Sequence, residues 1–321
     1  MSGRVVSTAS LIIDLPIQVS QLPERGGDVL GEGAPATPGG GFNIVAAAAR
    51  QRVAVGLLSP IGTGRNGDLG RQQLGAEGVA HLGRTATVLD TGYCVTLTEP
   101  DGERSFVTVP GAEAEVSPSD LPSDAVAWGD TVFLSGYDLC YAGSGPALVA
   151  WMAGLNSGIQ VVFDPGPLVG DIPPQLLAVV LARCDVLTLN EREAEILWDI
   201  RLSEAADPVA VARVAREQIH AGLSASASVL IRIGSRGCLI VGECVTLVPS
   251  IEVPMVDATG AGDAHAGALM ARLLLGDDLP RAVYLANIAA ALTVSQRGPA
   301  TSPTRGQVEA AAQQHRWSLP D

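Results

Sequence analysis

Residues 256–267 read VDATGAGDAHAG, and this stretch decides the fold. A strand-like segment, residues 247–256, leads into a glycine-rich turn, and an apolar helix is expected over residues 263–275. Small residues at positions 260 to 262 let consecutive backbone N–H groups point into one space, where they and the helix N-terminus can hold phosphate oxygens. Asp263 would then be placed to take a proton from an attacking hydroxyl group. A closely packed turn in which Asp263 favours the helix dipole explains the same residues.

Outward from this turn, short β-branched runs alternate with Ala-rich stretches. Buried strands are expected over residues 132–134, 159–163, 186–189 and 229–233. Helices are expected over residues 43–50, 148–154, 208–222 and 263–275. Asp207 is the predicted N-cap of the third helix. This alternation predicts a doubly wound α/β fold, a mostly parallel sheet flanked by helices.

Two segments break the alternation. Residues 91–99 and 103–109 alternate polar and apolar side chains around a Pro-Asp-Gly turn, which predicts a β-hairpin. Residues 14–37 are rich in Pro and Gly and have no helical period. We expect residues 14–37 and 91–110 to form a small β lid over the carboxyl ends of the strands, where α/β folds bind ligands. The large domain would then comprise residues 1–13, 38–90 and 111–321.

Composition excludes several classes of protein. All 20 basic residues are arginine, which excludes P-loop NTPases, Schiff-base pyridoxal-phosphate enzymes and protein kinases, because each needs a lysine. A formal net charge of −14 argues against nucleic-acid binding. No apolar run approaches the roughly 18 to 20 residues that cross a bilayer. The five cysteines form no CxxC motif, so a reduced, cytoplasmic location is expected.

A second glycine motif points to another class of protein. Residues 62–67 read GTGRNG, a literal GxGxxG between a strand-like segment and a helix expected from Asp68, as a dinucleotide-binding turn requires. The region about 20 residues further on is not a clear acid-terminated second strand. An NAD-linked oxidoreductase built on Gly62, Gly64 and Gly67 stays as an alternative.

Five motifs together resemble the signatures of the ribokinase-like (PfkB) carbohydrate kinase family. DATGAGD at 257–263 looks like its second signature, D-[TA]-x-G-A-G-D, and PGGGFN at 38–43 resembles its first. NERE at 190–193 is similar to the family's N-x-x-E, and IGSRG at 233–237 to its LGxxG. DGER at 101–104 with the following Gly111-Ala112 matches the family's lid. Order and spacing fit over most of the chain.

The resemblance implies an ATP-dependent kinase of a small sugar or sugar derivative that uses Mg²⁺. It implies Asp263 as the catalytic base, beside an anion hole made by Gly260, Ala261 and Gly262. For the substrate it implies Asp14, at the end of the first strand, with Gly40, Gly41 and Asn43. For the nucleotide it implies Asn190, Glu193, Gly234, Gly237 and Asn287, with Glu193 reaching Mg²⁺ through water. A K⁺ site, if the chain has one, would lie at Asp257, Thr259, Gly298 and Ser302.

Taken singly, several of these residues suit ordinary structural roles. Asn190 and Glu193 also form a helix-capping pattern. Asp14 suits a turn at a strand end and Asn43 the start of a helix. Asn287 lies in an Ala-rich stretch and could simply pack there.

The chain departs from the family pattern in four places. Two residues instead of the usual three separate the glycine pair at 39–40 from the asparagine of the first signature. His265 stands where an aromatic residue is usual, and we expect it to be a core residue. Arg232 stands where Thr is frequent and would alter nucleotide contacts; Glu113 stands where Asn is frequent and would alter the pocket rim.

Alternatives within the enzyme class also follow. A nucleoside kinase shares these motifs but needs a base-stacking pocket, for which the candidates are Phe42, Tyr93, Phe106 and Tyr137. A substrate that already carries a phosphate would need a clamp such as Arg104 in the lid. A sugar-binding regulator without catalysis is a third alternative. The expected partner is a small sugar-like molecule, with no nucleic acid or membrane, and a homodimer through the lid is compatible with an exposed sheet face.

Overall fold

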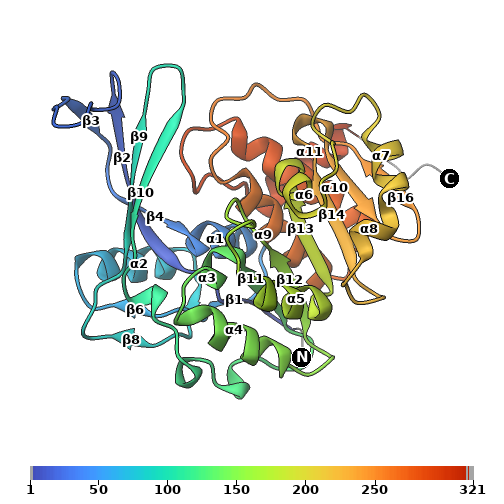
Figure 1. Cartoon of the computed structure of the whole chain (residues 1–321), viewed down its shortest axis with the longest axis horizontal. Helices are drawn as coiled ribbons and strands as arrows, with labels where there is room; N and C mark the ends of the chain where they lie inside the picture. The colour runs from blue at the N-terminus through green and yellow to red at the C-terminus, as the bar shows by residue number, and fades with distance from the viewer. Residues whose placement is uncertain (1–2, 316, 318–321) are drawn as a thin grey trace.

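Nine strands form the central sheet of the computed structural model, which describes residues 3–315 and residue 317 (Figure 1). They are β1 (Val5–Ser7), β5 (Val55–Leu57), β7 (Ala80–His81), β11 (Thr131–Ser135), β12 (Gln160–Asp164), β13 (Val186–Asn190), β14 (Ser228–Arg232), β15 (Cys238–Val241) and β16 (Val245–Val248). Their order is β16-β15-β14-β13-β12-β11-β1-β5-β7. The pairs from β14 to β7 are parallel, whereas β15 and β16 pair antiparallel at one edge.

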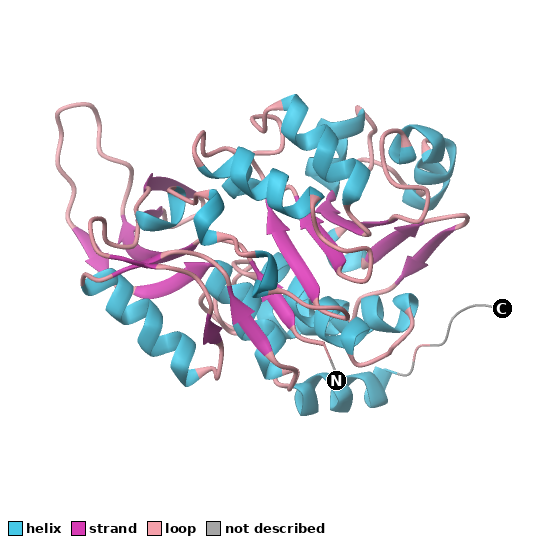
Figure 2. Ribbon diagram, turned by 90° about the horizontal axis from the view of Figure 1, so that it is seen from below, coloured by secondary structure: helices cyan, strands magenta, loops and turns pink. Residues whose placement is uncertain are grey.

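Helices cover both faces of this sheet because strand side chains alternate between two hydrophobic cores (Figure 2). Val5 and Phe133 point to one core, and Val6 and Val132 to the other. The first core is shared with α1 (Gly41–Arg50), α2 (Arg65–Ala76), α9 (Ala261–Leu274), α10 (Leu279–Val294) and α11 (Arg305–His315). The second is shared with α3 (Gly136–Leu139), α4 (Ser144–Ala153), α5 (Pro174–Arg183), α6 (Glu191–Trp198), α7 (Pro208–Val214) and α8 (Arg216–His220). The doubly wound α/β fold is confirmed.

Helices α1 and α9 pack unusually closely. A Cβ atom on Gly267 would lie 2.5 Å from the carbonyl oxygen of Ile44 and 2.7 Å from the Cβ of Ala47. Only glycine leaves room for this approach of two helix backbones. The Ala-rich sequence of α1 supports it from the other side, because small side chains keep the helix surface thin.

A second sheet, the predicted lid, stands away from the main body in Figure 1. It contains β2 (Leu11–Val19), β3 (Gly31–Gly33), β4 (Thr37–Gly40), β9 (Tyr93–Thr98) and β10 (Arg104–Val109). The order is β10-β9-β2-β3, with β4 also paired to β2. Antiparallel pairing of β9 with β10 confirms the expected hairpin. Outside both sheets, β6 (Ile61–Gly62) pairs with β8 (Thr85–Ala86).

Some boundaries differ from the expectation. The second sheet takes in residues 11–13 and 38–40, which were expected in the large domain, because Leu11 pairs with Gly40. The strand expected over 247–256 ends at Val248, where Pro249 follows and cannot donate to a strand ladder. The helix expected over 208–222 is divided into α7 and α8.

Other elements agree more closely with the expectation. Asp207 caps α7, since its carboxylate accepts from the amide of Ala210 at 3.0 Å. Short 3₁₀ helices lie at Ala112–Ala114, Pro118–Asp120, Ser123–Ala125 and Gly234–Arg236. Among the helices that the structure describes, none has both the length and the apolar character needed to cross a bilayer.

Candidate active site

The glycine-rich turn before α9 presents free backbone N–H groups. Gly260 has φ +76°, and a Cβ atom there would lie 2.1 Å from the carbonyl oxygen of Pro299, so only glycine fits. The amides of Gly262 and Asp263 donate to no other residue within the described part of the chain. Ala261 and Gly262 are partly exposed, so the turn is open to a ligand. This is the geometry expected of an anion hole.

Asp263 lies in the first turn of α9 and meets the first turn of α1. Its Oδ2 accepts a hydrogen bond from Nδ2 of Asn43 at 2.9 Å. Burial raises the pKa of Asp263 to about 6, against the opposing effect of the bond from Asn43. A carboxylate with this pKa is ionised at neutral pH and is basic enough to accept a proton. Oδ1 of Asn43 is buried and accepts no hydrogen bond from the described residues, which leaves it for a ligand.

Asp14 lies within β2, the second strand, and not at the end of the first strand as expected. Burial and the negative charge of Asp263 raise its pKa to about 6, so the two carboxylates share one electrostatic environment. The carboxylate lies over the backbone of β4, where a Cβ atom on Gly39 would stand 2.0 Å from Oδ2 of Asp14. Glycine at position 39 is therefore required for Asp14 to hold its place.

Gly40 is the N-cap residue of α1, and Gly41 is the first residue of this helix. Gly40 has φ +58°, and the amide of Gly41 donates to the carbonyl oxygen of Ser10 at 2.7 Å. Ser10 is held in turn by Asp138, a buried carboxylate whose oxygens accept from the Ser10 amide at 3.3 Å and from the Ser10 hydroxyl. Burial raises the pKa of Asp138 to about 7. Sequence reasoning missed Asp138, which has no motif around it.

Asn190 and Glu193 form the predicted capping box at the start of α6. The Glu193 amide donates to Oδ1 of Asn190 at 2.9 Å, and the Asn190 amide donates to Oε2 of Glu193 at 2.7 Å. The helix-capping alternative is confirmed, while contact with Mg²⁺ or phosphate stays a prediction. Among the described residues, no three His, Cys, Asp or Glu side chains cluster so that they could hold a metal ion directly.

Arg232 and Asp164 complete the edge where β12, β13 and β14 end. Nη1 of Arg232 donates to Oδ2 of Asp164 at 2.9 Å and to Oγ1 of Thr188 at 2.7 Å. Its Nη2 lies 3.7 Å from Oε2 of Glu193. Asp164 was missed, although an aspartate that ends a strand and precedes Pro-Gly at the carboxyl edge of a parallel sheet was a usable signal.

The loop after β14 adjoins the end of β16. Gly237 has φ +108°, and a Cβ atom there would lie 2.1 Å from the carbonyl oxygen of Val248; Gly234 has φ +61°. Asn287 on α10 donates through Nδ2 to the carbonyl oxygens of Val248 and Pro249 at 2.9 and 3.1 Å, and it is buried. The structure thus gives Asn287 a packing role, and nucleotide contacts of these three residues stay predictions.

The residues of the predicted K⁺ site are partly brought together. Oδ1 of Asp257 accepts from the Thr259 amide at 2.9 Å, and Oδ2 accepts from the Gly298 amide at 3.1 Å. Burial alone would raise the pKa of Asp257, but bonds from Thr259 and Gly298 and the charge of Arg104 hold it at about 2. The hydroxyl of Ser302 is buried and has no hydrogen-bond partner among the described residues.

Arg104 joins the lid to this loop. Its Nη2 donates to Oδ1 of Asp257 at 2.6 Å, and its Nη1 donates to Oγ1 of Thr259. Figure 1 shows the β9–β10 hairpin beside the loop that precedes α9. The β9–β10 hairpin is therefore held against the backbone just before the glycine turn.

Glu113 was expected to alter the pocket rim. In the structure its side chain holds the base of the β9–β10 hairpin. Its carboxylate accepts from the amides of Gly92 at 2.9 Å and Gly111 at 2.7 Å. Gly92 precedes β9 and Gly111 follows β10, so one buried side chain ties both ends of the hairpin together. Burial raises the pKa of Glu113, against these hydrogen bonds.

The GxGxxG loop is filled by a side chain of the protein itself. Asp90 accepts hydrogen bonds from the amides of Gly64, Asn66 and Gly67 at 3.1, 3.0 and 3.0 Å. Burial would raise the pKa of Asp90, but these bonds outweigh it and lower the pKa. Since a carboxylate already occupies these amides, they are not free for a pyrophosphate, which argues against the NAD alternative.

Aromatic and histidine side chains are also placed. His265 is buried, and burial together with the charge of Arg232 lowers its pKa to about 3, so it is a neutral core residue as expected. Phe42 belongs to the first hydrophobic core and is unavailable for base stacking. Tyr137 packs against Gly166 near the carboxylates Asp263 and Glu193, which together with burial raise its pKa to about 12.

Comparison with known proteins agrees with this geometry. The model of the pfkB family carbohydrate kinases matches residues 2–305. An uncharacterized sugar kinase of Escherichia coli (strain K12), YegV, is 32% identical over 306 residues, which are 95% of this chain and 92% of that protein. The ATP-dependent ribose-1-phosphate kinase of Halopiger xanaduensis is 30% identical over 312 residues, covering 96% and 97%. The ribokinase of Cryptococcus neoformans var. grubii in complex with ADP superposes with a TM-score of 0.82 at 25% identity, over 97% and 100% of the two chains. The chain belongs to the pfkB family of carbohydrate kinases.

Proposed function

We propose that this carbohydrate kinase transfers the γ-phosphoryl group of ATP to a hydroxyl group of a small, unphosphorylated sugar, with Asp263 as the base. The substrate hydroxyl gives its proton to the Asp263 carboxylate as its oxygen bonds to the γ-phosphorus. The bond between that phosphorus and the β–γ bridging oxygen breaks, and ADP leaves. The free amides of Gly262 and Asp263 stabilise the charge on the transferring group.

One observation carries this proposal: the first turns of α1 and α9 bring Asn43 onto Asp263 at 2.9 Å, beside an open turn of free amides. Asp14, whose pKa is raised by burial and by the charge of Asp263, supplies a second carboxylate. A base, an amide cradle and acceptors for hydroxyl groups therefore lie in one place.

The test replaces Asp263 with Asn, which keeps the shape and removes the base. We expect kcat to fall by about 10³-fold or more, since proton acceptance and the anionic partner of Asn43 are lost together. Binding of ADP, measured by calorimetry, should change little. An Asp68→Asn variant, at an exposed carboxylate on α2, is the matched control. Near-normal turnover of Asp263→Asn would refute the proposal.

ATP and Mg²⁺ are the cofactors in this proposal. Asp164 ends β12, Glu193 lies in the first turn after β13, and both carboxylates contact Arg232. These two carboxylates would hold Mg²⁺, through bound water. When bound, Mg²⁺ would neutralise phosphate charge during transfer. Asn190 orients Glu193 through the capping box.

The charge of the pocket supports an unphosphorylated substrate. Asp14 and Asp263 raise the local negative charge, and Arg104 is engaged with Asp257 and so does not act as a phosphate clamp. Neutral hydroxyl groups can donate to these carboxylates, whereas a substrate phosphate would be repelled by them. An ADP-release screen across free sugars, sugar phosphates and nucleosides distinguishes these substrates; turnover of sugar phosphates alone would contradict the proposal.

We expect K⁺ to bind at Asp257 only where it displaces the Arg104 side chain. The Asp257 carboxylate already accepts from Thr259, Gly298 and Arg104, so a cation there would have to displace the guanidinium.

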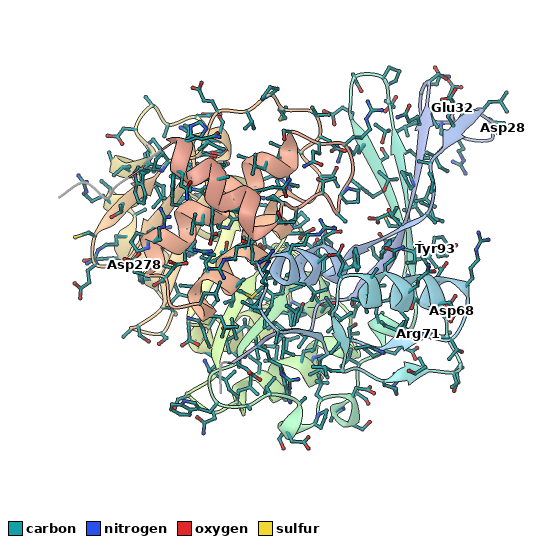
Figure 3. All side chains as sticks on the ribbon, turned by 180° about the vertical axis from the view of Figure 1, so that it is seen from behind. Asp28, Glu32, Asp68, Arg71, Tyr93 and Asp278 are labelled. Carbon is teal, nitrogen blue, oxygen red and sulfur yellow. The ribbon has the colours of Figure 1, made fainter. Side chains whose placement is uncertain are left out.

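A homodimer through the lid and a cytoplasmic location complete the proposal. Phe106 and Val107 are exposed on β10, an edge strand, and pairing with a second lid would cover them. Asp28 and Glu32 project from the far end of the lid, where like charges would meet only if two tips faced each other (Figure 3). Light scattering gives the molar mass that tests the dimer.

Five free cysteines and a need for ATP favour a reducing, ATP-containing compartment.

A further inference from the structure

Arg232 stands directly against the glycine turn. Its Nη2 lies 3.7 Å, and its Cζ 3.9 Å, from the position that a Cβ atom on Gly262 would take. The side chain reaches this place from the end of β14, where Arg232 pairs with Asn190 of β13. It therefore approaches the anion hole from the sheet.

Only part of the guanidinium group is used by the protein. Nη1 donates to Asp164 and Thr188, which fixes the plane of the group. Nη2 and Nε donate no hydrogen bond to any residue that the structure describes, and Glu193 stands 3.7 Å from Nη2 as an ion pair. The side chain is 14% exposed, so the guanidinium group is largely shielded from bulk water.

Four carboxylates make the surroundings of the glycine turn negative, and a nearby cation would offset this charge. Asp14, Asp263, Asp164 and Glu193 are all carboxylates, and a bound triphosphate would add further negative charge. The chain has no lysine, so the side-chain cation must be an arginine. Arg104 is bonded to Asp257 and Thr259, before the turn, whereas Arg232 lies beside Gly262.

We propose that Arg232 contacts the terminal phosphoryl group of the nucleotide through Nη2 and stabilises its charge during transfer. This inference rests on the proposed kinase activity. A guanidinium group in this position can bind two phosphoryl oxygens, as a threonine hydroxyl cannot. The alternative is that Arg232 only holds Asp164 and Glu193 in place, and the experiment separates these two roles.

The experiment compares Arg232→Met and Arg232→Lys with Arg272→Met. Arg272 is a matched control, because it is buried on α9 and paired with Asp277 and Glu309 at 2.6 and 3.0 Å, away from the turn. For each variant, kcat is measured, and the dissociation constants of ADP and of a non-hydrolysable ATP analogue are measured by calorimetry.

We expect Arg232→Met to lower kcat by about 100-fold or more and to reduce the preference for the ATP analogue over ADP by about tenfold. Arg232→Lys should recover part of kcat, since it restores a charge without the fork. Arg272→Met should match the wild type in both readouts. A kcat within about threefold of the wild type, or equal weakening of ADP and the analogue, would overturn the inference.

Loss of Arg232 leaves Asp164 without its partner, so Arg232→Met could fail to fold. The same comparison is then made in an Asp164→Asn background, where adding Arg232→Met should again lower kcat by at least about tenfold. No further decrease there would overturn the inference. Asp263→Asn is assayed in parallel: if it is inactive while Arg232→Met is active, only this inference fails, and if Asp263→Asn is active, the proposed function fails as well.

Discussion

Burial raises the pKa of both Asp14 and Asp263 to about 6, and the negative charge of Asp263 adds to the shift of Asp14. The base must be ionised to accept a proton, so kcat/KM should fall as the pH drops below about 6. The bond from Asn43 favours the ionised form of Asp263 and limits this loss.

Replacing Asp14 with Asn tests the coupling. Because the repulsion between two like charges is mutual, removing the Asp14 charge should move the acidic limb of the kcat/KM profile to lower pH, in addition to weakening substrate binding. The profile is measured by steady-state kinetics between about pH 5 and 8. Asp68→Asn, an exposed carboxylate on α2, should leave the limb unchanged. An acidic limb of Asp14→Asn that coincides with the wild type would show that the two groups do not interact.

The sequence identified those residues of the site that belong to contiguous motifs. Asp263 and Asn43 each sit in a signature, and the structure joins them. It could not foresee that Arg232 binds Asp164 and Thr188, because these residues meet only through the register of three neighbouring strands. Contacts of this kind depend on sheet order, which local sequence patterns do not specify.

The β9–β10 hairpin is held at both of its ends. At its base, Glu113 ties Gly92 to Gly111. Near its tip, Arg104 at the start of β10 bonds to Asp257 and Thr259, just before Gly260. Closure of the lid and order of the turn are therefore linked through one arginine.

Replacing Arg104 with Met removes this link and frees Asp257 for a cation. We expect kcat to fall about tenfold without K⁺, because the turn loses one of its supports, and to recover partly as K⁺ is added. Wild-type turnover should respond little to K⁺. Turnover is titrated with K⁺ against tetramethylammonium, with Arg84→Met, paired to Asp120, as control. A variant whose K⁺ response equals that of the wild type would contradict the competition.

Element types were predictable where the hydrophobic period is strong, and boundaries were not. Strands β11 to β14 agree within a residue or two with the expected apolar runs. Asp14 was misplaced because its strand, β2, continues from the main body into the lid, and only pairing with β4 and β9 shows where it belongs. Asp90 was likewise invisible as the occupant of the GxGxxG loop, since it lies more than 20 residues away along the chain.

For the molecule as a whole, the raised carboxyl pKa values make stability and activity depend on pH in opposite directions. Asp138 has a pKa of about 7, and Asp14 and Asp263 have pKa values of about 6, all above the ordinary carboxyl value of 3.8. A group whose folded pKa is raised contributes stability that is present at low pH and is lost as the pH rises through the folded pKa. The formal net charge of −14 acts in the same direction, because ionisation adds to self-repulsion.

The melting temperature should accordingly be higher near pH 6 than near pH 8, by roughly 3–6 °C. Calorimetry at several pH values measures this, and an Asp138→Asn variant should show a smaller change. Asp257, with a pKa of about 2, loses its contribution only at much lower pH and does not interfere in this window. A melting temperature that rises from pH 6 to pH 8 would show that these carboxyl groups do not control stability.

The close contact at Gly267 has a consequence for chemistry one helical turn away. Asp263 precedes Gly267 by four residues, about 6 Å along the axis of α9, and Asn43 lies next to Ile44, whose carbonyl oxygen touches Gly267. The close packing of the two helices at this crossing thus sets the distance between the Asp263 carboxylate and the Asn43 amide. A methyl group added at Gly267 would push α1 and α9 apart and so move Asn43 away from Asp263. A residue that does not contact the sugar would therefore govern how well the proton acceptor is aligned.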